Sequence, residues 1–165
     1  MRLNSLEDLL QNQILKLYNS ELQISQILPV LTEASYSSDL RQTFLAHLRR
    51  TEEQMKRLEK VLKILNVEHD GEWCIAAEGL LNECKELFRV EADPAVKDTA
   101  LIYAAQRLTQ YEVSCYCAAH TSAREIGYDE VAEILEEILE EECGIDKQLN
   151  SLAKGGFFSI DSKTE

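Results

Sequence analysis

The sequence predicts an all-α protein, a four-helix bundle made of two antiparallel hairpins with a short crossover helix between them. The chain has 165 residues but only two prolines and six glycines, which is typical of a mostly helical domain. Four long segments repeat apolar residues at alternating steps of three and four, the period of a helix facing a bundle core. Turn signals near Tyr36 and Gly127 divide them into two pairs, within a length that suits one compact domain.

The first pair of helices has readable ends. A capping box at 5–8, Ser-x-x-Asp, opens the first helix. This helix should run to about Ala34 and kink at Pro29, because proline removes a backbone hydrogen bond. The serines at 37–38 cap a second helix that ends near Asn66. We therefore expect a hairpin of two long helices in the first part of the chain.

A crossover segment connects this hairpin to the second one. The polar stretch 67–72 is typical of a loop, and a shorter helix is expected over 73–90. Asp93 and Pro94 form an N-cap and first-turn pair that opens the next long helix. That helix should stop at Gly127, because glycine tolerates the backbone conformation that ends helices.

The last long helix completes the predicted bundle. Asp129 is expected to cap its start, and the glycines at 155–156 are expected to end it. Residues 157–165 would then form a polar C-terminal tail around two phenylalanines. The predicted domain boundaries are therefore 1–156 for the bundle and 157–165 for the tail.

Three glutamates stand at inward positions where the repeat calls for an apolar residue. Glu21, Glu112 and Glu142 each interrupt the apolar seam in the middle of a different long helix. Residues equidistant from the turn of an antiparallel hairpin lie at the same height, so the three should meet at mid-height in the bundle. Buried carboxylates need a metal, a proton or a cation to compensate them. Alternatively, the registers are slightly shifted and these side chains lie at solvent-facing edges.

The second long helix brings a polar but mostly uncharged middle to the same level. Its seam includes His47, a candidate ligand or a hydrogen-bonded core histidine, and Gln54. Arg50 lies one turn before Gln54. Since arginine stays charged and can bind two carboxylates, Arg50 could take the place of a metal among the acids. The alternative is that its long stem carries the guanidinium out to solvent.

Charge and cysteine content exclude several classes of function. A net charge of -13 and a pI near 4.7 repel nucleic acid and anionic membrane surfaces. No stretch is long and apolar enough for a membrane span, and Met1–Leu10 lacks the apolar core of a signal peptide, which predicts a cytoplasmic protein. The five cysteines lack metal-finger spacing and are expected as reduced thiols. No hydrolase or transferase motif is present.

Short motifs follow one another along nearly the whole chain in an order typical of one bacterial family. These motifs are Leu6-Glu7-Asp8-Leu9, Tyr18 with Glu21 and Gln23, His47 with Thr51 and Gln54, Arg57-Leu58-Glu59, Cys74, Glu78-Gly79-Leu80, Ala104-Ala105-Gln106, Tyr111-Glu112 with Tyr116, and Glu140-Glu141-Glu142 with Asp146. Taken together they resemble the YciF-type, or DUF892, family of stress-induced ferritin-like proteins. The resemblance covers residues from about 5 to 153.

This resemblance implies a cytoplasmic, homodimeric, ferritin-like protein with an iron or manganese carboxylate site, linked to stress and to peroxide. Together with His47 from the seam, the candidate metal ligands are Glu21, His47, Gln54, Glu112, Glu142 and Asp146. The chain departs from the family where relatives tend to have acids, at Lys16 and Arg50, and where they tend to have Glu-His, at 109–110. It also lacks the Glu-x-x-His pairs of a standard di-metal bundle, since Ile145 follows Glu142 by three residues.

Three functional hypotheses remain open at this level. The first is a metal-binding stress protein, whose di-metal form would be an oxidoreductase acting on a small-molecule oxidant such as peroxide. The second is a non-enzymatic structural or interaction protein in which Arg50 replaces the metal. The third is an iron-storage cage, which the short crossover helix makes the weakest of the three.

Overall fold

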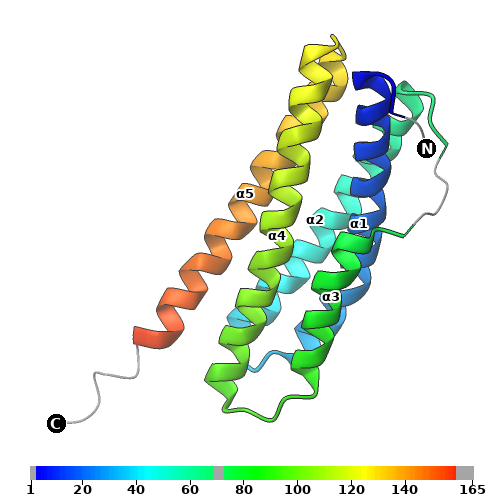
Figure 1. The fold of residues 1–165 in the computed structure, drawn as a ribbon. Coiled ribbons are helices and arrows are strands. Elements are labelled where there is room, and N and C mark those ends of the chain that lie inside the picture. The colour runs from blue at the N-terminus through cyan, green and yellow to red at the C-terminus, as the bar shows by residue number, and fades with distance from the viewer. Residues whose placement is uncertain (1–2, 69–72, 159–165) are drawn as a thin grey trace.

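The computed structural model describes residues 3–68 and 73–158, with side chains up to 154, and every regular element in that part of the chain is a helix. Figure 1 shows the bundle. Its helices are α1 (Leu6–Ala34), α2 (Ser38–Ile64), α3 (Ile75–Phe88), α4 (Pro94–Glu125) and α5 (Asp129–Phe158). The predicted all-α class is confirmed.

Most helix starts lie where the sequence predicts them. Ser5 caps α1, with its hydroxyl accepting from the backbone N–H of Asp8 while the Asp8 carboxylate accepts from the backbone N–H of Ser5. Ser37 caps α2 by accepting from the backbone N–H of Leu40, and Asp93 caps α4 by accepting from that of Ala95. Gly127 adopts a φ of 79° after α4, a conformation that side chains with a Cβ rarely adopt.

The ends of α5 differ from the prediction. The helix begins at Asp129, so this residue is the first of the helix and not its cap. It continues through 155–156 to Phe158, because glycine weakens a helix without forbidding helical backbone angles. The predicted tail 157–165 therefore begins inside α5, and its residues 159–165 lie outside the described part of the chain, as do 69–72 of the predicted loop.

The two hairpins pack side by side with α3 on their outer surface. α1 packs against α2 and α4 against α5, and the hairpins meet through the contacts of α1 with α4 and of α2 with α5. α3 lies over α1 and α4 (Figure 1). The Asp98 carboxylate accepts the backbone N–H groups of Tyr36 and Ser37 at 2.8 and 2.7 Å, which ties the turn of the first hairpin to the start of α4.

Two apolar clusters fill the bundle, one above and one below a polar layer. One cluster includes Leu17, Leu58 and Ile138, and the other includes Ile24, Leu108 and Ile145. The seams predicted for α1 and α2 are buried at every position, and that of α5 is buried from Val131 to Leu149. The predicted heptad repeat therefore describes three of the four long helices.

The seam of α4 contains one wrong step. Continued from Glu112 by a step of three, the apolar repeat points Cys115 inward, but this side chain is only half-buried, and Tyr116 is fully buried in its place. A helix of 3.6 residues per turn allows a step of either three or four, and small residues around 115–119 do not determine which one occurs. The larger tyrosine fills the space next to the polar layer.

Candidate metal centre

Six buried polar side chains form a layer across the middle of the bundle, and none is more than 3 % exposed. We call this set the polar layer; its members are Glu21 from α1, His47, Thr51 and Gln54 from α2, Glu112 from α4, and Glu142 from α5. The three glutamates predicted at inward positions are therefore buried together, and the alternative that they lie at solvent-facing edges is wrong.

Glu112 lies between the other two glutamates. The charges of both neighbours act on its carboxyl group, although neither of its oxygens has a hydrogen-bond partner. Burial, followed by the neighbouring Glu21 and Glu142, raises the pKa of Glu112 well above its usual 4.5. In the absence of a cation, this shift favours the protonated, neutral form of Glu112.

Glu21 and Glu142 are held by additional neutral partners. The hydroxyl of Tyr116 donates to Oε1 of Glu21, and Nε2 of Gln54 donates to Oε1 of Glu142 at 2.8 Å. Burial still dominates, and it raises the pKa of Glu21 to about 8 and that of Glu142 to about 7. Hydrogen bonds to neutral groups thus orient both acids without neutralising their charge.

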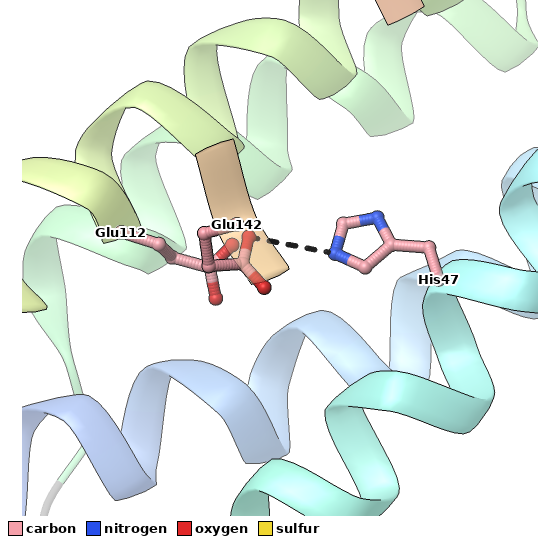
Figure 2. Close-up of side chains that lie close together, drawn as sticks. All are labelled: His47, Glu112 and Glu142. Carbon is pink, nitrogen blue, oxygen red and sulfur yellow. Dashed lines mark ion pairs between the residues drawn. The ribbon is translucent and has the colours of Figure 1, made fainter. Parts of the chain in front are cut away.

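His47 faces these acids from α2. Its Nε2 lies 4.0 Å from Oε2 of Glu142 (Figure 2). Burial, with Arg50 as a second cause, lowers the pKa of His47 to about 4, so the imidazole is neutral at pH 7 and this contact is not a salt bridge there. One donor atom each from His47, Glu112 and Glu142 lies within 4.8 Å of the other two. Neutral imidazole is the form that binds metals.

The donor atoms of the layer fit a divalent cation. Both carboxyl oxygens of Glu112, both ring nitrogens of His47 and Oε2 of Glu142 are buried without a hydrogen-bond partner. Buried polar atoms of this kind cost free energy unless something binds them. Carboxylate oxygens with an imidazole nitrogen suit iron and manganese. Bonds of about 2.1 Å would place two ligands of one ion roughly 3 to 4 Å apart. The donor atoms here lie within 4.8 Å of one another, so a small inward movement of these side chains would complete the site.

A chain of polar contacts leads from the layer to the surface between α2 and α5. Gln54 Nε2 donates to Oε2 of Glu141 at 3.1 Å as well as to Glu142. Glu141, about one third exposed, also binds Arg57, whose Nη1 lies 3.7 Å from Glu137 Oε2. The neighbouring surface cavity has a volume of about 590 Å³ and contains Glu137 and Glu141 in its wall. The outer face of α5 is thus connected to Glu142 through one glutamine.

Arg50 does not occupy the position that the second hypothesis requires. Its side chain is exposed and lies in the wall of the surface cavity next to Glu137, Glu140 and Glu141. Among the described residues it forms no ion pair with the buried glutamates, although its charge still lowers the pKa of Glu142. The prediction of a buried cation at Arg50 is therefore wrong, because the long stem carries the guanidinium to solvent.

Asp146 also lies apart from the polar layer. It is half-buried one turn beyond Glu142, and its Oδ2 accepts from Nδ2 of Asn150 at 3.2 Å. It contributes to a different cavity, next to Tyr111 and Arg107, and does not belong to the group of donor atoms formed by His47, Glu112 and Glu142. The structure thus separates Asp146 from the other five predicted ligands.

Comparisons with known proteins identify the family. The family model described as "Domain of unknown function (DUF892)" matches residues 5–158. The chain belongs to the DUF892 family. It is 34% identical over 154 residues to Protein YciF of Escherichia coli strain K12, covering 93% of each chain. The resemblance predicted from the ordered motifs is confirmed.

Solved structures agree with the fold. The crystal structure of the E. coli stress protein YciF has a TM-score of 0.90 and 34% identity, with 93% of this chain and 98% of that chain covered. YcfI from Rhodopseudomonas palustris has a TM-score of 0.86 and 34% identity, covering 90% and 94%. A protein from Xanthomonas campestris is 18% identical, with a TM-score of 0.74 and 92% of each chain covered, and it supports the fold alone. The ferritin-like class is confirmed.

Two side chains around this DUF892 site were not placed by sequence reasoning. The ordered motifs contain both Arg57 and Tyr116, but they do not indicate that Arg57 pairs with the acidic face of α5 or that Tyr116 is buried beside Glu21. The spacing of four residues from Glu112 to Tyr116 could have indicated the second. Within the described residues, no helix is long and apolar enough to cross a membrane.

Proposed function

We propose that this DUF892 protein is a ferritin-like bacterial stress protein that binds one ferrous or manganous ion through His47, Glu112 and Glu142. The observation that carries the proposal is the set of convergent donor atoms within 4.8 Å that are buried and lack hydrogen-bond partners. The stress assignment rests on the similarity to the E. coli protein that is described as a stress protein.

The charges of the layer support one divalent ion. Two ionised glutamates with a neutral histidine would balance a 2+ charge, and the bound ion would displace the proton that Glu112 otherwise holds. Glu21 is placed to act behind Glu112, where it can accept a hydrogen bond from Tyr116 and orient its neighbour. One group of three ligands supports a single ion better than the two ions of a standard di-metal site.

Chemistry on a small-molecule oxidant is an extension of this proposal. A bound iron or manganese ion supplies a redox-active Lewis acid when an open coordination position remains. The protein's own contribution would be twofold. The apolar clusters on both sides would exclude water from the site, and Tyr116 and Glu112 would hold protons. Peroxide is the oxidant that the family resemblance favours.

Metal analysis tests the binding site directly. Protein purified without chelator, and apoprotein titrated anaerobically with ferrous or manganous salt, should contain about one ion per chain. Glu112→Gln and His47→Ala should both lose the ion, because each removes a ligand. Glu140→Gln, on the exposed face of α5, is the matched control and should bind like the original protein. Less than about 0.2 ion per chain after reconstitution would rule out the proposal.

The predicted cytoplasmic location and homodimer belong to the same proposal. Light scattering at known protein concentration distinguishes a dimer from the cage of an iron-storage ferritin, because the masses differ greatly. A cage would overturn the dimer and revive the third hypothesis.

A further inference from the structure

A second group of reactive side chains lies in a cavity on the other side of α4. The cavity has a volume of about 590 Å³ between α1, the start of α3 and α4. Cys74, Cys115 and Tyr111 contribute to its wall together with Lys16 and Trp73. None of these residues belongs to the polar layer, so the proposed metal site does not explain why they gather here.

The cavity brings the two thiols together. Sγ of Cys74 lies 3.2 Å from the hydroxyl oxygen of Tyr111, and Cys115, one turn beyond Tyr111 on α4, lines the same cavity. The charge of Cys74 acts on Cys115, so the two thiols lie near each other. They come from different helices, since Cys74 caps α3 and Cys115 lies inside α4.

The surroundings of these thiols are electropositive, although the protein as a whole carries a net charge of -13. Lys16 lies in the same cavity wall, and its charge acts on Cys115. Cys74 sits at the N-terminus of α3, where the helix dipole favours negative charge. A backbone hydrogen bond from the Cys74 N–H to Oε1 of Gln23, 3.0 Å long, fixes its position. A nearby lysine and a helix N-terminus are typical of reactive cysteines, and a small oxidant would reach the buried Cys74 through the cavity that it lines.

We propose that Cys74 and Cys115 are a redox-active thiol pair that hydrogen peroxide oxidises to a disulfide joining α3 to α4. Cys74 is the attacking thiol, because it lies at the helix N-terminus. Cys115 is the second thiol, since burial outweighs the effects of Tyr111 and Lys16 and raises its pKa. When the disulfide forms, Cys74 would exchange its contact with the Tyr111 hydroxyl for a bond to Cys115.

The reaction balances with peroxide as the oxidant. The Cys74 sulfur attacks one peroxide oxygen, the O–O bond breaks, and the departing hydroxide takes the Cys74 proton to leave as water. The Cys115 sulfur then attacks the sulfur of the resulting sulfenic acid, the S–O bond breaks, and the hydroxide leaves with the Cys115 proton as a second water. Each sulfur loses one electron, and one peroxide is reduced to two waters.

The other three cysteines provide internal controls. Cys84 is buried in the apolar cluster that includes Ile24 and Leu108, where burial raises the pKa of its thiol to about 11. Cys117 is exposed, and Cys143 is half-buried on α5, directly after Glu142. All five are free thiols in the structure. Selective pairing of Cys74 with Cys115 would therefore reflect their geometry and not exposure alone.

Peptide mapping by mass spectrometry tests the pair. Reduced protein would be treated with a small molar excess of hydrogen peroxide in the presence of a chelator, its remaining thiols blocked, and the digest analysed without reductant. The expected result is one crosslinked peptide containing Cys74 and Cys115 in most chains. Absence of this peptide, or crosslinks through Cys117 or Cys143 instead, would overturn the proposal.

Variants separate the two roles. Cys115→Ser should leave a sulfenic acid on Cys74 that dimedone traps, whereas Cys74→Ser should leave Cys115 unoxidised. Cys117→Ser should form the crosslink as the original protein does. Dimedone labelling of Cys115 in Cys74→Ser would reverse the assigned order of attack, and the map of the original protein decides the pairing even if a variant fails to fold.

Discussion

Glu141 and Glu142 are adjacent on α5, yet they belong to two very different regions. Glu142 lies fully buried in the polar layer, and burial raises its pKa to about 7. Glu141 lies on the acidic outer face of the helix and pairs with Arg57. One step along a helix turns a side chain by about 100°, which here separates the bundle interior from solvent. The electrostatic role of a glutamate in this protein therefore depends on its position around the helix.

The largest expected effect of this difference is on the pH dependence of stability without metal. The folded pKa values of Glu21, Glu112 and Glu142 are raised above the ordinary 4.5 of an unfolded chain, so the folded protein holds more protons between about pH 4.5 and pH 8. Its free energy of unfolding should therefore be highest below this window and decrease by several kcal/mol as pH rises through it, since each pKa unit corresponds to about 1.4 kcal/mol. Urea unfolding of the apoprotein at pH 5 and pH 8 measures it.

Neutral variants locate the source of that pH dependence. Glu112→Gln should make the decrease smaller, because an amide cannot ionise and no longer repels its two neighbours. Glu140→Gln, on the exposed face, should leave the decrease unchanged. An equal effect of both substitutions would mean that general surface repulsion, and not the polar layer, causes the pH dependence.

Asp98 is a buried acid outside the polar layer, and its carboxylate, unlike those of the glutamates, is fully hydrogen-bonded. Its substitution should give the next largest effect. Asp98 is 9 % exposed, but two backbone N–H groups satisfy its carboxylate. Asp98→Ala should lower the free energy of unfolding by about 2 kcal/mol, because the N–H groups of Tyr36 and Ser37 lose their partner. Thermal unfolding measures the change, with Asp39→Ala on the exposed side of the same turn as the comparison. Equal losses in the two variants would contradict this account.

Gly144 lies on the outer side of α5, two residues from the polar layer. A Cβ atom added there would meet no other atom within 4 Å. Gly144→Ala should therefore raise the free energy of unfolding by about 0.7 kcal/mol through helix propensity alone. Denaturant unfolding would detect this gain. A loss would indicate that the surface cavity next to Arg50 and Glu140, which Gly144 also lines, is occupied in solution.

Arg50 should give the smallest effect. Because its side chain is exposed, Arg50→Ala should change the free energy of unfolding by less than about 0.5 kcal/mol. A loss of about 3 kcal/mol, the range for breaking a buried ion pair, would instead restore the hypothesis that this arginine replaces the metal. Matched urea unfolding curves of the two proteins distinguish these outcomes.

The sequence predicted the fold and much of the polar layer because both follow from helical periodicity. The seams of α1, α2 and most of α5, and hence Glu21, His47, Gln54 and Glu142, can be read from the spacing of apolar residues. Periodicity fails where small residues surround the seam, which explains the exchange of Cys115 for Tyr116. It also says nothing about long side chains, whose charged ends lie far from their Cα atoms, and so it misplaced Arg50 and overlooked Arg57.

Trp73, the chain's single tryptophan, is 52 % exposed. It contributes to the cavity that contains Cys74 and Cys115 and to a second cavity between α1 and α3. Indole fluorescence responds to solvent polarity and to nearby sulfur atoms. This protein therefore carries an intrinsic optical reporter whose emission follows events on the α3 side of the bundle, without any added label.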